Sequence, residues 1–405
     1  MHRWLLALTI LLAPELRAQD SAGTPNGRLA QIQQQRVEKA ASLSTPEPAK
    51  TGGLGGSFSR LAPVFHYVPI GVAVPGLGTG AWPTIESRFR KSMDDGRLTG
   101  TAWGRLTFRY FYSVGTGAEY RSRSKEELTV SLQGSYANSP QLDYYGPGPN
   151  SSIHNHTNFR REDTLFNFRA GVKTSQDLAE ACHIGQLLQH VGPGTSGDLP
   201  TTQSVFGPIQ APGIEKQSNY LIPGCSLDVD LRDFPEDPHK GTHVLAAFDR
   251  YYAEDASRFS FYRVSVLGEQ FIPFFNRKRV IALRGRTELN YHSTNQVVPF
   301  YLQPTLGSDT DLRGYRRYRF YDENLLSVSA EYRWEIGTGF DMALFVDGGD
   351  VFHRPSQISL FDVKNSFGFG LRFKNQSERR VIARLDAGFS REGFQIWLRV
   401  PEFFF

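Results

Sequence analysis

The sequence predicts an all-β protein, a transmembrane antiparallel β-barrel of about sixteen strands. Apolar and polar side chains alternate along one segment after another. No internal apolar run reaches the ~18 residues that a membrane helix needs, and the chain begins like an exported protein. About sixteen strands of roughly ten residues each, with their connections, account for most of the 405 residues.

The clearest strand pattern covers residues 325–336. One face of this segment is apolar and the other carries three charges, because successive strand residues point to opposite faces. The apolar face holds Leu326, Val328, Ala330, Tyr332, Trp334 and Ile336, and the polar face holds Ser327, Ser329, Glu331, Arg333 and Glu335. A membrane barrel would turn the first face to lipid and the second to a wet lumen.

The same alternation recurs at residues 128–136, 166–173, 227–232 and 281–291. A soluble sandwich would need a second apolar sheet to cover each apolar face, so the repetition favours a membrane barrel. A mean hydropathy of −0.38 agrees with a barrel, whose lumen face is polar. A soluble secreted β protein stays as the alternative fold.

The N-terminal residues predict export. Residues 1–18 form the expected signal peptide, with a basic start at Met1-His2-Arg3, an apolar core and cleavage after Ala18. Residues 19–56, rich in Gly, Pro, Ser and Gln, are expected to form a flexible periplasmic lead-in. Residues 57–405 would then be the barrel.

Two short motifs lie on either side of the 325–336 strand. Leu312-Arg313-Gly314-Tyr315 lies in a long loop, roughly residues 293–324, and Phe345-Val346-Asp347-Gly348-Gly349 lies on the strand after next. Arg313 would be a cation inside the lumen, facing the carboxylates of Asp347 and Glu331. Such a hydrogen-bonded pair would contribute about 1.5–3 kcal/mol. The pair either only pins the loop or also supports opening of the barrel seam or passage of a substrate.

The two motifs, in this order and spacing, resemble the BamA/TamA-like outer-membrane barrels, also called bacterial surface antigens. That superfamily includes insertases and two-partner secretion translocators. Residues 312–315 match its [VIL]-R-G-[FY] loop motif, residues 345–349 match F-x-D-x-G, and residues 331–333 (Glu-Tyr-Arg) are also typical. The resemblance implies an outer-membrane barrel of a diderm bacterium with one long loop folded into the lumen, and with Asp347, Glu331, Phe345 and Gly349 as partners of that loop.

Weaker resemblances place several other segments. Residues 62–67 look like the opening strand, and residues 144–150 resemble a Tyr-Gly-x-Gly segment after an early strand. Residues 232–241 resemble an R-D…P-x-x-G turn on the periplasmic side. The glycine-rich stretch at residues 71–80 is expected at a seam or bend. The polar residues 174–217 are expected to form an extracellular loop, with a short helix at residues 177–190.

Cys182 and Cys225 are the two cysteines of the chain. An exported protein with two cysteines suits one disulfide, here a staple of the long loop, although two unpaired thiols would also fit the spacing. The C-terminal strand contains Trp397 and ends on the aromatic Phe405, as bacterial outer-membrane barrels typically do, and assembly machinery is expected to recognise it. Pro401 would lie at a frayed strand end or at the seam.

The sequence favours neither an enzyme nor a cofactor protein. It contains no G-x-S-x-G, no H-E-x-x-H and no pair of C-x-x-C motifs. His154 and His156 could together hold a metal, but no third ligand is evident, so solvated loop histidines are expected and no metal is predicted. With 45 basic and 41 acidic residues, the charge gives no reason to expect nucleic acid as a partner.

The expected function is the assembly or translocation of proteins at the outer membrane, with lipid and unfolded client proteins as partners. The lead-in at residues 19–56 is too short for a polypeptide-transport-associated (POTRA) domain, which family insertases carry. A separate periplasmic partner is therefore expected to recruit clients. The alternative is a plugged or narrow outer-membrane pore, or a structural surface barrel, without a client protein.

Overall fold

The computed structural model describes residues 70–77, 84–123, 127–255, 258–275, 278–337, 339–357, 363–375 and 380–404. For residues 70–77 and 401–404 it describes the backbone alone. The predicted signal peptide, the lead-in, the opening-strand segment at residues 62–67 and Phe405 lie outside the described residues.

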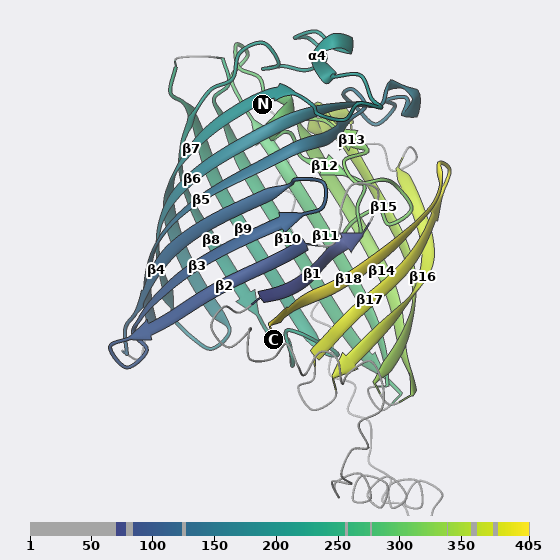
Figure 1. The fold of residues 1–405 in the computed structure, drawn as a ribbon. Coiled ribbons are helices and arrows are strands. Elements are labelled where there is room, and N and C mark those ends of the chain that lie inside the picture. Colours follow the sequence, from purple (N-terminus) through teal and green to yellow (C-terminus); the bar gives the residue numbers. More distant parts are fainter. Residues whose placement is uncertain are drawn as a thin grey trace, which may run out of the picture. The chain divides into compact units, whose positions relative to one another are not determined.

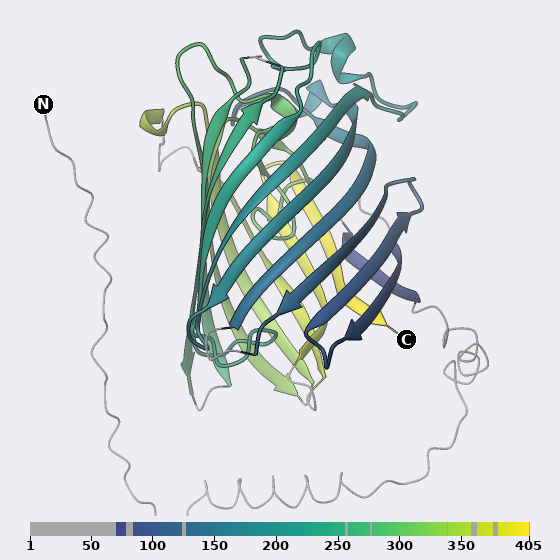
Figure 2. The ribbon, with the colours of Figure 1, turned by 90° about the vertical axis from the view of Figure 1, so that its left-hand side faces the viewer.

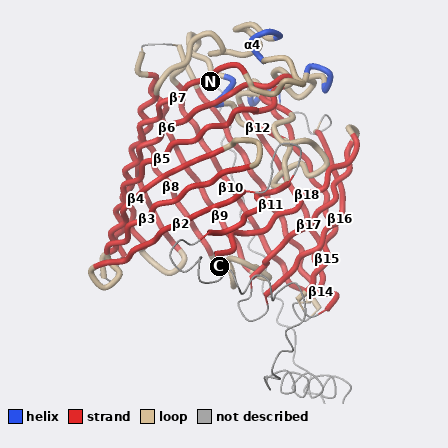
Figure 3. The backbone as a smooth tube through the Cα atoms, viewed as in Figure 1, coloured by secondary structure: helices blue, strands red, loops and turns tan. Residues whose placement is uncertain are grey.

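Within these ranges, sixteen strands form one closed antiparallel barrel (Figures 1 and 3), which confirms the predicted fold class. The barrel strands are β1 (Ile70–Leu77), β2 (Thr84–Met93), β3 (Leu98–Thr107), β4 (Tyr112–Arg121), β5 (Glu127–Tyr144), β6 (Thr157–Lys173), β7 (Leu178–Pro193), β8 (Tyr220–Asp230), β9 (Gly241–Ala253), β10 (Phe261–Phe274), β11 (Arg279–Tyr291), β14 (Asn324–Gly337), β15 (Phe340–Phe352), β16 (Lys364–Asn375), β17 (Arg380–Ser390) and β18 (Gly393–Phe404).

Short elements lie in the connections between the barrel strands. β12 (Thr305–Leu306) and β13 (Phe320–Tyr321) pair with each other inside the long connection from β11 to β14. The helical turns are η1 (Ile153–Asn155), α4 (Thr202–Val205), η2 (Phe300–Leu302) and η3 (Pro355–Gln357). Among the described residues, no helix is both long and apolar enough to cross a membrane.

The two faces of the wall differ as the alternation predicts. Outward side chains such as Leu132 and Val328 are exposed, whereas Glu331 and Asp347 on the inner face are buried. The buried charged side chains of these strands therefore face the lumen.

The two ends of the barrel also differ. The connections at residues 194–219 and 292–323 are long, and α4 lies at their end of the barrel (Figure 1). The turns at residues 94–97, 174–177 and 231–240 lie at the opposite end and are short. Long extracellular loops and short periplasmic turns are typical of outer-membrane barrels, so the end that carries α4 is the extracellular one.

One sequence prediction is wrong in this region. Residues 177–190 do not form a helix in an extracellular loop, because β7 (Leu178–Pro193) occupies them, and the loop is limited to residues 194–219. The Leu, Ala, Glu and Gln residues of this segment favour helix in isolation. Pairing with β6 on one edge and β8 on the other overrides that preference.

The barrel closes where β1 pairs with β18, and this seam is irregular. Val72 pairs with Phe403 but Val74 pairs with Val400, so the register shifts between the two pairs and again before Leu77. Pro401 lies within the first shift, and irregular positions of this kind are among the few in a sheet that tolerate proline. The seam therefore has fewer regular backbone pairs than long strand pairs such as β10 with β11.

Candidate functional site

Residues 292–323, called here the inner loop, connect β11 to β14 and carry the predicted [VIL]-R-G-[FY] motif. Within the loop, Leu312 and Tyr315 flank Arg313-Gly314 and are both buried. They belong to an apolar cluster that ties the loop to β14 and β15. Its members are Leu306, Leu312, Tyr315, Phe320, Leu325 and Val351.

Arg313 is the centre of the loop's polar contacts, and its side chain is 4% exposed. Its guanidinium binds Asp347 in a bidentate manner, with Nη2 donating to Oδ1 at 2.7 Å and Nε to Oδ2 at 3.0 Å. Nη1 donates to Glu331 Oε2 at 2.6 Å. The guanidinium carbon also lies 3.4 Å from the centre of the Phe345 ring, which is a cation–π contact. Four side chains predicted to meet in the lumen are thus in contact.

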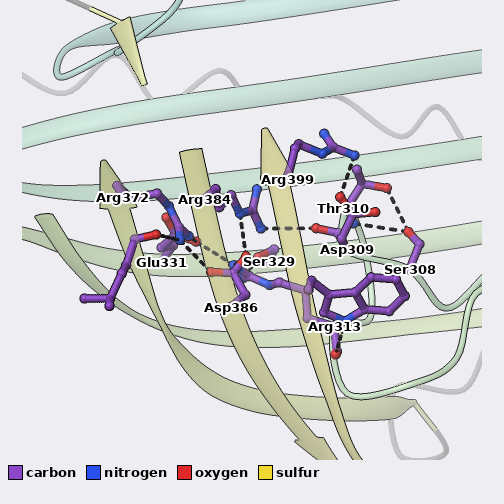
Figure 4. Close-up of polar contacts among 12 residues, drawn as sticks. Ser308, Asp309, Thr310, Arg313, Ser329, Glu331, Arg372, Arg384, Asp386 and Arg399 are labelled. Carbon is purple, nitrogen blue, oxygen red and sulfur yellow. Dashed lines mark hydrogen bonds and ion pairs between the residues drawn. The ribbon is translucent and has the colours of Figure 1, made fainter. Parts of the chain in front are cut away.

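The charges continue beyond the predicted residues. Glu331 accepts from Arg372 on β16 at 3.0 Å, and Arg372 donates to Asp386 on β17 at 2.5 Å. Arg384 also pairs with Asp386 (Figure 4). Basic and acidic groups therefore alternate across β14 to β17. This alternation matters because a buried ion that lacks a partner is strongly destabilising.

Glycines let the loop lie directly against the wall. A Cβ built on Gly314 would be 2.6 Å from the carbonyl oxygen of Phe389, and one built on Gly388 would be 2.3 Å from the carbonyl oxygen of Arg313. Gly349, a predicted partner, lies under Leu306, whose nearest methyl would be 3.0 Å from an added Cβ. Because non-bonded atoms cannot approach this closely, neither the loop at Gly314 nor the wall at Gly349 and Gly388 has room for a side chain.

The loop also contacts the last strand of the barrel. The indole Nε1 of Trp397 on β18 donates to the Arg313 carbonyl oxygen at 2.7 Å, and the Trp397 side chain is buried. Arg399, two residues further along β18, forms an ion pair with Asp309 of the loop at 2.5 Å. One loop segment thus connects the F-x-D-x-G strand to the strand that borders the seam. We call the contacts of Arg313 with Asp347, Glu331, Phe345 and Trp397 the latch.

Two further acids of the inner loop are buried. Burial raises the pKa of Asp311, which is paired with Arg286 at 3.4 Å. Burial also raises the pKa of Asp322 to about 6, and the nearby carboxylates of Glu323 and Asp350 act in the same direction. The loop is therefore sensitive to protonation in a pH range close to neutral.

An apolar cluster, called here the roof, joins the inner loop to the extracellular connection 194–219. Phe300 and Tyr301 of the inner loop pack with Phe206, Ala211 and Ile214 of that connection. The backbone N–H of Phe300 donates to the Pro212 carbonyl at 2.9 Å. The cluster extends to the upper parts of β5, β6 and β7 through Leu142, Tyr144, Phe159 and Val191. The roof therefore lies between the lumen and the extracellular side.

At the periplasmic end, the turn at residues 231–240 reaches strands that are not its neighbours. Lys374 of β16 binds Asp237 of the turn at 2.8 Å and also pairs with Asp341 of β15. All three side chains are largely buried. We call this turn the floor. The turn was predicted from its R-D…P-x-x-G pattern, but its attachment to β15 and β16 was not.

Cys182 and Cys225 are directly paired across β7 and β8, and their sulfurs form a disulfide. They therefore connect two wall strands and do not staple a loop, as the sequence had suggested. His156 pairs with Asp143 at 3.0 Å and stacks on Tyr145, while His154 is exposed. In the ranges that the structure describes, no group of three or more His, Cys, Asp or Glu residues is arranged to hold a metal.

These features define an outer-membrane β-barrel whose lumen loop is bonded to the last strand of its own wall. The model of the Omp85 superfamily domain matches residues 107–377, more than half of the chain, and the protein belongs to the Omp85 superfamily. No curated protein matches the sequence.

Two solved structures illustrate the shared fold. BamA from Haemophilus ducreyi lacking POTRA domains 1-3 aligns with a TM-score of 0.62 at 13% identity, over 83% of this chain and 70% of that chain. CdiB from Escherichia coli aligns with a TM-score of 0.53 at 12% identity, over 83% of this chain and 62% of that chain, which is less than two thirds of its length.

Proposed function

We propose that this barrel assembles or translocates polypeptides at the outer membrane by opening its seam between β1 and β18. The observation that carries the proposal is the double attachment of the inner loop. Arg313 contacts Asp347 on β15 through its side chain and Trp397 on β18 through its carbonyl oxygen. A loop that binds the strand beside the seam can hold that strand in place while β1 separates from it.

The irregular pairing of the seam supports this proposal. β1 has eight residues, and its register against β18 shifts twice. Each missing ladder bond removes about 0.5–1.5 kcal/mol of net stabilisation. Strand pairs such as β10 with β11 run without a shift over thirteen residue pairs. Opening the seam is therefore expected to cost less than separating a long regular strand pair such as β10 with β11.

The roof and the floor support a seam route over an open pore. The roof packs Phe300 and Tyr301 against the extracellular connection, and the floor attaches Asp237 to Lys374 across the periplasmic end. A steady solute channel would require both to be displaced. Opening the seam requires neither, because both are bonded to strands other than β1.

In this proposal the residues have separate roles. Arg313 and Asp347 hold the loop, Glu331 connects Arg313 to Arg372, and Phe345 supports the guanidinium. Trp397 transmits the position of the loop to β18, in addition to any role that it and Phe405 have in recognition of the strand by assembly machinery. Unfolded barrel or secreted proteins are the clients, and a separate periplasmic partner delivers them.

The test uses the purified protein refolded into liposomes, with a second barrel added from urea. Wild-type protein is expected to speed folding of the second barrel. A Val74→Cys, Val400→Cys variant, oxidised to lock the seam at a directly paired position, is expected to lose the acceleration. The control is Ala246→Cys with Val266→Cys, which locks the paired strands β9 and β10 and should keep it.

Acceleration that persists after oxidation of the seam pair would contradict the seam route. Wild-type liposomes that give no acceleration, together with steady single-channel conductance in planar bilayers, would contradict the proposed function and favour a pore. Reductant added to all samples, including wild type, controls for loss of the Cys182–Cys225 bond.

A further inference from the structure

Three strands near the seam are shorter than the three strands that follow them in the wall. β2, β3 and β4 have 10 residues each, whereas β5, β6 and β7 have 18, 17 and 16. Tyr112 begins β4 and pairs with Asn138, after which β5 continues to Tyr144. These extra residues correspond to ~20 Å along the strand. Figure 2 shows the turn between β3 and β4, in dark blue, well short of the extracellular ends of β5 to β7.

The outer surface of the neighbouring strands locates the upper edge of the lipid-facing band. Leu132 and Phe166, which point outward from β5 and β6, are 60% and 53% exposed. Further toward the extracellular end of these strands, the outward-facing side chains are polar. Tyr136 donates to Glu162 at 2.9 Å, and Asn138 donates to the Tyr112 hydroxyl at 3.4 Å. The change from apolar to polar thus lies at Tyr112, the residue at the base of the β3–β4 turn.

The side chains of this turn are unusual for an extracellular loop. Phe108 and Tyr110 are 67% and 77% exposed, and Arg109 between them is also exposed. Aromatic residues collect at the boundary between acyl chains and headgroups, and arginine reaches from that boundary to polar groups. Below the turn, the paired Leu106 and Tyr112 and then Val114 continue the same exposed apolar surface down the wall.

Part of the backbone of the turn is hydrogen-bonded within the turn itself. Thr107 accepts from the Tyr110 N–H through its carbonyl oxygen at 3.0 Å and from the Phe111 N–H through Oγ1 at 3.1 Å. The Thr107 N–H donates to the Phe111 carbonyl at 2.8 Å. A lipid environment penalises unpaired backbone groups, and these internal bonds reduce that cost for a turn that lies at the headgroup boundary.

We propose that residues 108–110, at the tip of the β3–β4 hairpin, lie within the outer leaflet of the membrane and bind lipid. Phe108 and Tyr110 contact acyl chains next to the headgroups, and Arg109 extends toward the anionic groups of those lipids. The occupant is lipid because the tip continues the lipid-facing surface of the barrel and coincides with its upper edge. The inference stands independently of the proposed function.

The test measures depth by spin labelling. The native cysteines are joined in a disulfide, so a nitroxide attaches to a newly introduced cysteine. Tyr110→Cys and Phe108→Cys carry the label at the tip. Leu132→Cys is the control inside the lipid-facing band, and Ile209→Cys, at a 91% exposed position of the extracellular connection, is the control in water. All variants are refolded into phosphatidylcholine–phosphatidylglycerol vesicles.

Labels at residues 108 and 110 are expected to collide more with oxygen than with a water-soluble nickel chelate, as the label at residue 132 does. Tip labels that behave like the label at residue 209 would overturn the proposal. Heat-modified mobility on gels verifies folding, and agreement of the two tip positions guards against a local disturbance by either label.

A second arm tests the headgroup contact of Arg109. The mobility of the label at residue 110 is expected to fall as phosphatidylglycerol is increased, and Arg109→Gln is expected to abolish that dependence. Equal behaviour of the labelled protein with and without the Arg109→Gln substitution would overturn the anionic contact, whereas the depth measurement decides separately whether the tip lies in lipid.

Discussion

Arg313 shows how much one side chain can connect in this barrel. Its guanidinium binds two carboxylates from adjacent strands and lies over an aromatic ring. Lysine could not reproduce this arrangement, because it is a point charge without the planar fork that binds a carboxylate through two hydrogen bonds. The identity of the residue therefore matters as much as its charge.

Arg313→Ala is expected to destabilise the barrel by about 3–5 kcal/mol, because Asp347 would remain buried without its cationic partner, while Glu331 would keep Arg372. Arg313→Lys should recover only a small part. The measurement is the midpoint of heat modification in detergent, together with proteolysis of the inner loop. The control is Arg160→Ala, whose more exposed pair with Glu162 should contribute no more than about 1 kcal/mol. Equal midpoints for the two Ala variants would rule out the latch.

Asp322 predicts a dependence of stability on pH. Burial raises its pKa in the folded protein to about 6, above the value of about 3.9 of an unfolded chain. The folded state therefore binds more protons between these two values, and stability falls as the pH rises through this window. At neutral pH the ionised carboxylate destabilises the protein by about 2–3 kcal/mol relative to acid.

Asp322→Asn is accordingly expected to raise the heat-modification midpoint at pH 7.5 and to leave it nearly unchanged at pH 4. The amide oxygen of Asn can still accept from the Glu323 N–H, as the carboxylate does. Asp177→Asn, in an exposed periplasmic turn, serves as the matched control and should show no such difference. A midpoint change at position 322 that is the same at both pH values would refute the assignment.

At the scale of elements, the fit between the inner loop and β17 depends on a missing side chain. Gly388→Ala would place a methyl group 2.3 Å from the Arg313 carbonyl oxygen. The expected loss is about 1–3 kcal/mol, as for other overpacked sites, with faster proteolysis of the inner loop. In Gly285→Ala the methyl group would meet nothing within 4 Å, so this variant is the control. The model of a close-fitting loop fails if both variants match wild type.

The strands themselves could be predicted largely from period-two alternation, and their contacts could not. Alternation marks residues 325–336 and 281–291 as strands, and both are. The motif residues Arg313 and Asp347 also meet as expected. Arg372 and Asp386 were missed, although each lies on a face with glycines and charges. Contact between non-neighbouring positions depends on strand register, and a single sequence contains little information about it.

Helix-favouring composition misled the interpretation of β7 for a related reason. Its inner and outer faces both carry polar groups, so alternation is weak, and the partners on its two edges decide its structure. The same applies to the cysteines, whose spacing suits a loop staple as well as a cross-strand bond. The strand structure of β7 and the cross-strand disulfide both depend on neighbouring strands, which lie outside the short sequence segments from which each prediction was made.

For the whole molecule, the floor connects regions that the strand order keeps apart. Lys374→Met would leave Asp237 and Asp341 without their shared cation, and we expect a loss of about 1.5–3 kcal/mol. Proteolysis within residues 231–240 should accelerate in parallel. Arg380→Met removes the more exposed pair with Glu236 and should lower the free energy of unfolding by no more than about 1 kcal/mol. Equal proteolysis in the two variants would argue against a fixed floor.

The bond between Trp397 and the Arg313 carbonyl oxygen also bears on the order of events during folding. The two residues are 84 positions apart, and β18 is synthesised after the other strands of the barrel. Contacts between distant positions form late, since the intervening chain has to be ordered first. The inner loop can therefore reach its final position only after β18 has joined the sheet, so a barrel interrupted before that step would display an unsecured loop to proteases that remove incomplete chains.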